Sequence, residues 1–207
     1  MATRRSKTKQ WVRRQAADTY VKQRHASGFR SRAAFKLKEI LARDRLLRKG
    51  ATVVDFGASP GGWSQVAAQS VGHTGRVVAV DLLPMEPLAD VCFIEGDARE
   101  GETLERIREA VGDRQVDLVI SDIAPNITGI RDLDEANFLE LAESVRAFVQ
   151  EVLSGNGAFV IKLFQFPGTD AYVRDLKEIF SSVARRKPDS SRKASREFYV
   201  VATGFKI

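Results

Sequence analysis

The chain has 207 residues, of which 43% are apolar, so it can fold as one domain with its own core. Its net charge of +6 hides a separation: residues 1–50 carry 16 Lys and Arg against 3 Asp and Glu, residues 51–180 carry 10 against 22, and residues 181–207 carry 7 against 2. The single cysteine excludes an internal disulfide framework and a cysteine-based zinc cluster, and two basic ends around an acidic middle favour a nucleic-acid partner.

Several further classes are disfavoured by the sequence. No apolar run is long enough to span a membrane, and the opening MATRRSKTKQ lacks the apolar core of a secretory signal. One cysteine suits a reducing compartment, so we expect a cytoplasmic protein with no membrane association. No exposed apolar stripe demands a partner subunit, and we expect a monomer.

The first 50 residues read as basic and helical. Residues 1–10 are predicted to be a disordered basic tail, and residues 11–207 a single domain whose part 11–50 consists of basic N-terminal helices. A helix is predicted over 11–26 and a second over 31–44, with Ser31 near the N-cap of the second. The second helix has a core stripe and, beside it, a basic face made of Arg32, Lys36 and Arg43.

From residue 51 the pattern changes to alternating strands and helices, which we expect to form the catalytic core. Short runs rich in β-branched residues are typical of parallel strands buried on both faces, and the last two runs read as an antiparallel hairpin. This predicts an α/β fold with a seven-stranded, mostly parallel sheet and helices on both faces. The expected strands are 52–57, 76–81, 91–97, 116–122, 157–164, 182–188 and 197–207; the expected helices are 62–70, 101–111, 134–153 and 168–180, with Thr169 or Asp170 as the last cap and 83–89 as a turn or loop.

Acidic residues stand at or near the ends of four expected strands: Asp55, Asp81, Asp97 and Asp122. A single Asp after a strand usually caps a turn or a helix. Ligands of open α/β sheets bind outside the carboxyl ends of the strands, so four carboxylates at that edge indicate a binding site.

The loop after the first strand, GASPGGW, lacks both the G-x-G-x-x-G dinucleotide fingerprint and the ending of a phosphate-binding loop. Its glycines still let a ligand approach the backbone, while the nearby carboxylates would repel a pyrophosphate. S-adenosylmethionine, a cationic nucleoside without phosphates, fits such a site better. Asp81 is placed to accept both ribose hydroxyls, and Asp97 to accept from the adenine amine or to cap the turn beside it.

Five segments resemble the FtsJ-type ribosomal RNA 2′-O-ribose methyltransferases: SGFRSRAAFKLKEI, VVDFGASPGGWSQV, VDLVISDIAPNITG, GAFVIKLFQ and RRKPDSSRKASREFYVVATGF. The resemblance runs from about Trp11 to Gly204. It implies a Rossmann-like fold and a methyltransferase activity that depends on S-adenosylmethionine. Ser59, where the family favours alanine, and Phe166, where glycine is common, depart from it at the rim of the pocket. The implied cofactor contacts are Gly61, Trp63, Asp81, Asp97 and Asp122, and the implied catalytic tetrad is Lys36, Asp122, Lys162 and Glu197.

The resemblance also implies a substrate, a uridine of large-subunit (23S) ribosomal RNA methylated on the assembled 50S subunit. Free lysine is a poor base at neutral pH, so two roles are open for Lys162: general base, or only the group that steers the hydroxyl oxygen. Asp122 is expected to orient Lys162, and Lys36 and Glu197 to position both Lys162 and the ribose. Basic residues near the N-terminus are expected to neutralise phosphates: Arg4, Arg5, Lys7, Lys9, Arg13 and Arg14. A second set is expected to frame the target nucleotide: Arg32, Lys187, Arg192, Lys193 and Arg196.

The same residues argue against two other kinds of methyl acceptor. Cytosine C5 methylation needs a cysteine nucleophile at the active edge, whereas Cys92 lies inside the third strand. Amino-methylation uses an N-P-P-Y type motif, and DIAPN lacks its aromatic residue. A cap-directed or other RNA ribose methyltransferase and a non-catalytic RNA-binding assembly factor remain the alternatives.

Overall fold

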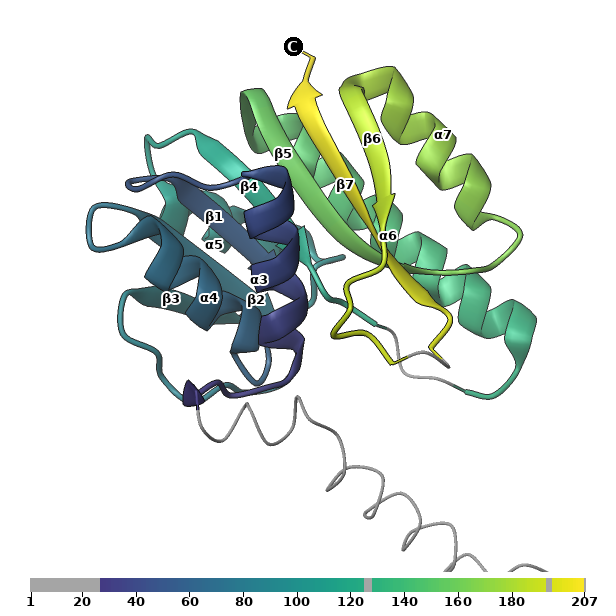
Figure 1. The fold of residues 1–207 in the computed structure, drawn as a ribbon, viewed down its shortest axis with the longest axis horizontal. Helices are drawn as coiled ribbons and strands as arrows, with labels where there is room; N and C mark the ends of the chain where they lie inside the picture. Colours follow the sequence, from purple (N-terminus) through teal and green to yellow (C-terminus); the bar gives the residue numbers. More distant parts are fainter. Residues whose placement is uncertain (1–26, 125–127, 193–194, 207) are drawn as a thin grey trace, which may run out of the picture.

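The computed structural model describes residues 27–124, 128–192 and 195–206. The predicted tail 1–10, the predicted helix 11–26 and Lys193 lie outside these described residues. The described part forms one seven-stranded sheet in the order β3-β2-β1-β4-β5-β7-β6 (Figure 1). Its strands are β1 Thr52–Phe56, β2 Arg76–Asp81, β3 Val91–Glu95, β4 Val116–Ser121, β5 Leu153–Phe164, β6 Phe180–Arg186 and β7 Glu197–Phe205.

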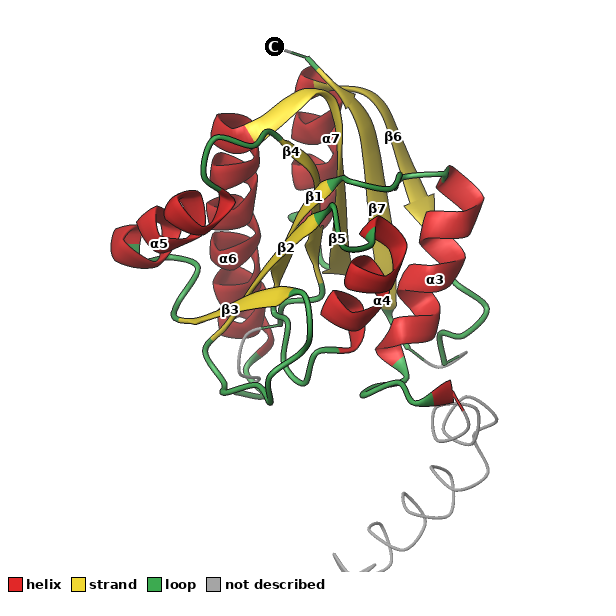
Figure 2. Ribbon diagram, turned by 90° about the vertical axis from the view of Figure 1, so that its left-hand side faces the viewer, coloured by secondary structure: helices red, strands yellow, loops and turns green. Residues whose placement is uncertain are grey.

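Helices cover both faces of the sheet (Figure 2). On one face lie α3 (Ala33–Asp44) and α4 (Gly62–Val71), and on the other lie α5 (Gly101–Val111), α6 (Arg131–Val152) and α7 (Thr169–Ile179). Each helix presents an apolar stripe to the sheet, such as Ala34, Leu37 and Ile40 on α3. Every residue of β1 is buried, as expected for a central strand covered on both faces. The predicted α/β fold is therefore confirmed.

The topology brings the ends of particular strands together. Strands β1 to β5 run parallel, and β7 pairs antiparallel with both β5 and β6. The chain moves outward from β1 through β2 to β3 and then returns to place β4 on the other side of β1. This reversal of strand order opens a crevice at the carboxyl ends of β1 and β4, where open α/β sheets bind ligands.

The N-cap of α3 is Arg32, so Ser31 lies next to the cap as predicted, where its side chain lies against Gly62. Two local predictions differ from the structure. The N-cap of α7 is Gly168, since the Thr169 hydroxyl is turned back to donate to the carbonyl of Phe164 (2.7 Å). Strand β5 begins at Leu153, immediately after α6, because that buried leucine already pairs with β4 across a register irregularity.

Within the described residues, none of the helices combines the length and the hydrophobicity that crossing a membrane requires.

Candidate active site

A cavity of about 540 Å³ lies at the carboxyl ends of β1, β2, β3 and β4. Its walls include three of the four acidic residues singled out by the sequence: Asp81, Asp97 and Asp122. Apolar and polar side chains complete it, with Leu82 and Leu83 after β2 and Asn137 and Leu141 on α6. An apolar pocket with a few convergent polar groups is the usual form of a small-molecule site.

Asp81 joins the two loops that frame this cavity. Its carboxylate accepts the backbone N–H of Ser59 (2.9 Å), from the loop after β1, and that of Leu83 (2.8 Å), from the loop after β2. Each carboxylate oxygen has more than one acceptor direction, so Asp81 can still accept from a ligand hydroxyl.

Asp97 is part of the cavity wall and also caps the turn after β3. It accepts the backbone N–H of Arg99 (2.9 Å) and pairs with the Arg99 guanidinium (2.6 Å). These hydrogen bonds and the arginine charge outweigh the effect of burial and lower the pKa of Asp97. Both roles that the sequence allowed for this residue are thus compatible with its position.

Asp55 does not line the cavity, in contrast to the expectation that four carboxylates share the site. It is fully buried beneath α4, where Oδ2 accepts from the Ser64 hydroxyl (2.6 Å) and Oδ1 has no hydrogen-bond partner among the described residues. Burial raises the pKa of Asp55 to about 8, aided by the charges of Asp122 and Asp81, although the Ser64 hydrogen bond opposes the shift. The side chain points inward because Asp55 alternates with Phe56, which enters the opposite core.

The glycines of the loop after β1 serve backbone packing. Gly57 has φ +76°, and a Cβ there would lie 2.7 Å from the Ile123 Cα, so only glycine lets β1 and β4 end side by side. Gly61 has φ +104° and faces Met85, Leu88 and the aliphatic part of Arg30. Its predicted cofactor contact stays a prediction.

Trp63 likewise lies outside the wall that the described residues form around the cavity. It is buried, its indole N–H donates to the carbonyl of Ala33 (2.8 Å), and its ring packs at 5.6 Å from that of Tyr199. In this structure it links α4 to α3, and its predicted contact with a cofactor is untested.

The predicted tetrad comes together beside the cavity. Lys162 on β5 donates to the main-chain oxygen of Asp122 (2.5 Å), and its Nζ lies 3.1 Å from the Asp122 carboxylate. Lys36 on α3 pairs with Glu197 at the start of β7 at 2.5 Å. As whole residues, Lys162 and Lys36 are only 8% and 9% exposed. Burying an ammonium is costly unless it is paired, and each of these two has a carboxylate partner. The expected basic face of α3 is therefore partly an ion-pairing face.

Sheet register explains how four distant segments meet. Lys162 stands opposite Tyr199 in the β5–β7 pair, and Glu197 lies two residues before Tyr199, on the same face. Although burial acts to raise the pKa of Glu197, the hydrogen bond and charge of Lys36 and the charges of Lys162 and Lys187 lower it overall. The two ion pairs thus form one electrostatic cluster.

Tyr199 was missed by the sequence reasoning. It is fully buried, its hydroxyl donates to Asp122 Oδ1 (3.3 Å), and the Lys36 ammonium lies 5.6 Å from its ring centroid. Burial, followed by the charges of Asp122 and Glu197, raises its pKa, so Tyr199 remains a neutral donor. The signal available in the sequence was its spacing of two from Glu197, which places both side chains on one face of a strand.

Asp122 belongs to both parts of the site. It forms part of the cavity wall and contacts Lys162 and Tyr199 of the polar cluster. Its own N–H donates to the carbonyl of Phe56 (3.1 Å), which fixes it at the junction of β1 and β4. A small molecule in the cavity therefore has the tetrad at one end.

The family follows from comparison of the whole sequence. The sequence model of the FtsJ-like methyltransferases matches residues 29–205. The chain belongs to the FtsJ-like methyltransferase family. The catalytic residues expected from the resemblance all fall within the matched range, and the fold carries them to one place.

Several solved structures share the fold of this chain. A Plasmodium falciparum protein, provisionally described as a ribosomal RNA methyltransferase, shares 28% identity with a TM-score of 0.77 over 86% of this chain and 98% of its own. A provisional hemolysin of Lactococcus lactis (15% identity, TM-score 0.59, 85% and 88% covered) and a provisional rRNA methylase of Clostridium thermocellum (15%, 0.54, 81% and 96%) show the same fold.

Proposed function

We propose that this FtsJ-like methyltransferase transfers a methyl group from S-adenosylmethionine to the 2′-hydroxyl of a uridine in 23S ribosomal RNA, on the assembled 50S subunit. We further propose that it works in the cytoplasm as a monomer. The observation that carries the proposal is the position of Asp122, which is shared between the cavity and the Lys36–Glu197 and Lys162 groups. The ribosomal RNA methyltransferase description of the Plasmodium falciparum neighbour supports the choice of RNA class.

The residues present fit S-adenosylmethionine. Acidic groups of the cavity wall suit a cationic ligand. Asp97 is paired with Arg99 and Asp122 with Lys162, whereas the Asp81 carboxylate accepts two neutral backbone N–H groups. Asp81 would accept from the ribose hydroxyls, and Leu82 and Leu83 offer apolar surface to the adenine. When bound, the cofactor supplies an electrophilic methyl group on a sulfonium.

The tetrad is suited to aligning and deprotonating a ribose hydroxyl. The Lys162 amine lies against the carboxylate and the main-chain oxygen of Asp122, and its remaining hydrogen-bonding capacity is available to the 2′-oxygen. As an ammonium it holds the hydroxyl oxygen in line; as a neutral amine it takes the proton. Lys36 and Glu197 hold the neighbouring wall of the site, so much of the rate enhancement comes from alignment.

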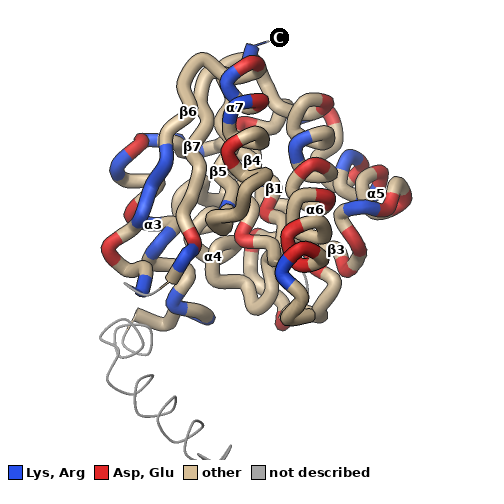
Figure 3. The backbone as a smooth tube through the Cα atoms, turned by 90° about the vertical axis from the view of Figure 1, so that its right-hand side faces the viewer, with Lys and Arg blue, Asp and Glu red and all other residues tan. Residues whose placement is uncertain are grey.

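The distribution of charge gives the RNA a side from which to approach. Lys and Arg follow α3 and the nearby β6 edge, whereas Asp and Glu are dense on α6 (Figure 3). Basic residues near α3 and the β6–β7 connection would neutralise phosphates beside the tetrad without reading bases: Arg32, Lys187, Arg192 and Arg196.

Methyl transfer to defined RNAs tests the proposal. Purified protein with labelled S-adenosylmethionine should methylate 50S subunits from cells that lack the enzyme, at one uridine 2′-oxygen. Lys162→Ala should lose at least about a hundredfold in kcat while its cofactor affinity stays within about threefold. A pH–rate profile then separates the two roles of Lys162, since a general base gives a rate that rises with pH.

The alternatives predict other results. Methylation of a capped RNA but not of 50S subunits would favour the cap-directed enzyme. RNA binding without any methyl transfer would favour the assembly factor and overturn the proposal.

A further inference from the structure

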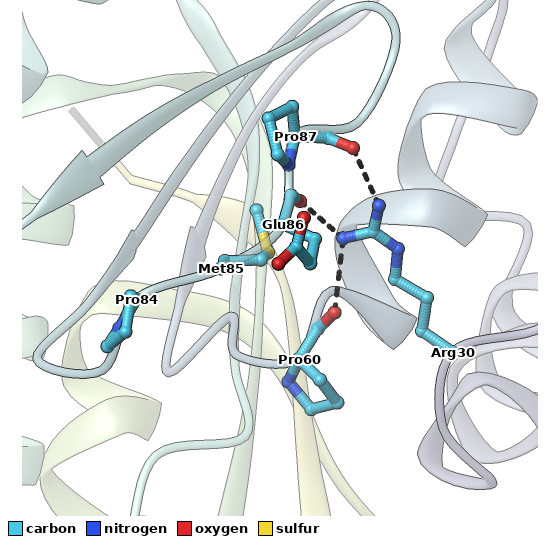
Figure 4. Close-up of a pocket in the computed structure, with 6 residues that line it drawn as sticks. All are labelled: Arg30, Pro60, Pro84, Met85, Glu86 and Pro87. Atoms are coloured by element: carbon cyan, nitrogen blue, oxygen red, sulfur yellow. Dashed lines mark hydrogen bonds between the residues drawn. The ribbon is translucent and has the colours of Figure 1, made fainter.

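Arg30 gathers backbone carbonyls from two loops (Figure 4). Its guanidinium donates to Glu86 (2.5 Å) and Pro87 (2.6 Å) in the loop after β2 and, through a longer bond of 3.4 Å, to Pro60 in the loop after β1. The close-up shows the guanidinium between these carbonyls, in the wall of a pocket that Pro84 and Met85 complete. We call this group of contacts the Arg30 clasp.

The clasp joins the same two loops that Asp81 joins. Asp81 accepts N–H groups of Ser59 and Leu83 on the cavity side, whereas Arg30 donates to carbonyls of Pro60, Glu86 and Pro87 farther along the same loops. The loop after β2 contains prolines at positions 84 and 87, which have no N–H to donate. Fewer backbone donors are therefore available to the carbonyls of this loop, and the Arg30 side chain donates to two of them.

The segment that carries Arg30 is itself held firmly. The Gln65 side chain on α4 accepts the Arg30 N–H (3.1 Å) and donates to the Gly28 carbonyl (3.0 Å). The Arg30 side chain lies against Gly61, and Ser31 lies against Gly62, where no larger residue would fit. Arg30 thus starts from a fixed base, three residues before the helix that carries Lys36.

We propose that Arg30 is a positioning residue that holds the loops after β1 and β2 in the arrangement that binds S-adenosylmethionine. The proposal rests on the proposed function in one respect, namely that the cavity between Asp81 and Asp122 is the cofactor site. Arg30 does not line the cavity itself. It connects the two loops on the side away from the cavity, next to the start of α3. The contacts among Lys36, Asp122, Lys162 and Glu197 do not involve Arg30, so we expect its replacement to leave them in place.

Direct cofactor binding and steady-state kinetics of variants test this role. Calorimetric titration with S-adenosylmethionine should give a Kd about tenfold higher for Arg30→Ala than for the wild-type protein, because three bonds to a charged donor are lost. The KM for the cofactor should rise in parallel, and kcat at saturating cofactor should stay within about twofold. Arg30→Lys keeps the charge but loses the fork geometry, and should give an intermediate Kd.

A matched control is available at the amino ends of the strands, opposite the cavity. Arg114, just before β4, also donates to a loop carbonyl, that of Thr74 (3.0 Å), and Arg114→Ala should leave the Kd unchanged. Gln65→Ala loosens the base of the clasp and should raise the Kd by a smaller factor than Arg30→Ala. A purely structural role would lower the folded fraction of Arg30→Ala without moving the KM of the folded part.

Each outcome decides the matter. A Kd within twofold of wild type for both Arg30→Ala and Arg30→Lys overturns the proposal, as does a fall in kcat at constant KM. Should Arg30→Ala fail to fold, the Arg30→Lys and Gln65→Ala titrations carry the test alone. Wild-type protein that binds S-adenosylmethionine but methylates no RNA refutes the proposed function and leaves the Arg30 titration valid, whereas wild-type protein that binds no cofactor refutes both.

Discussion

The Lys36–Glu197 ion pair gives the sharpest test of how the site is held together. The two side chains are 11% and 15% exposed and lie 2.5 Å apart. Removing one partner of a buried pair leaves an uncompensated charge, which costs about 3–5 kcal/mol, while replacing both by apolar residues is often nearly neutral. Because this pair is slightly exposed, we expect Glu197→Leu to lose about 3 kcal/mol and Lys36→Met about 2 kcal/mol of unfolding free energy.

The double variant Lys36→Met/Glu197→Leu should lose only about 2 kcal/mol, which gives a coupling energy of about 3 kcal/mol. Urea unfolding of the four proteins at pH 7 measures this, with an unchanged m-value as the check that each variant unfolds in the same way. All three variants should be inactive, so stability and catalysis are read separately. A coupling energy below about 0.5 kcal/mol would show that the two groups do not form the pair on which the site is built.

The pH dependence of that coupling has a definite sign. The pKa of Glu197 is lowered in the folded protein. Its stabilisation is therefore fully present above the pKa of an unfolded glutamate, about 4.3, and is lost as the pH falls through the lower folded value.

Three further predictions concern the cavity and its floor. Gly57→Ala should lose about 2 kcal/mol of stability or more, since its Cβ would meet the Ile123 backbone at positive φ, whereas Gly101→Ala, with open space and no positive φ, should change little; equal effects in urea unfolding would contradict this. Asp55 binds its proton more tightly when folded, with a pKa of about 8, so wild-type stability should decline by a few kcal/mol from about pH 5 to pH 8 and Asp55→Asn should flatten that slope; parallel curves would refute the assignment. Asp81→Asn should weaken S-adenosylmethionine binding about tenfold, because one of the two backbone N–H donors that the carboxylate accepts would then face an amide NH2 group; unchanged affinity in calorimetry would remove Asp81 from the site.

The sequence determined the architecture because its signals are local. Runs of β-branched residues alternating with helical stripes specify strands and helices within a few residues of their observed bounds, and the motifs that carry the family resemblance predict which residues form the tetrad. Charge separation along the chain also indicated the basic side of the molecule. Helix caps were less predictable: the N-cap of α7 is Gly168, and the Thr169 hydroxyl bonds the carbonyl of Phe164 before the helix instead of capping it.

Only the tertiary structure decided which way the side chains point and which distant residues come into contact. Asp55 and Asp81 look alike at the ends of two strands, yet strand alternation sends Asp55 beneath α4 and leaves Asp81 on the cavity wall. The role of Tyr199 depends on its register with Lys162, and that of Arg30 on carbonyls some 30 to 57 residues away in sequence. Such contacts arise from packing between elements, and no pattern within one element records them.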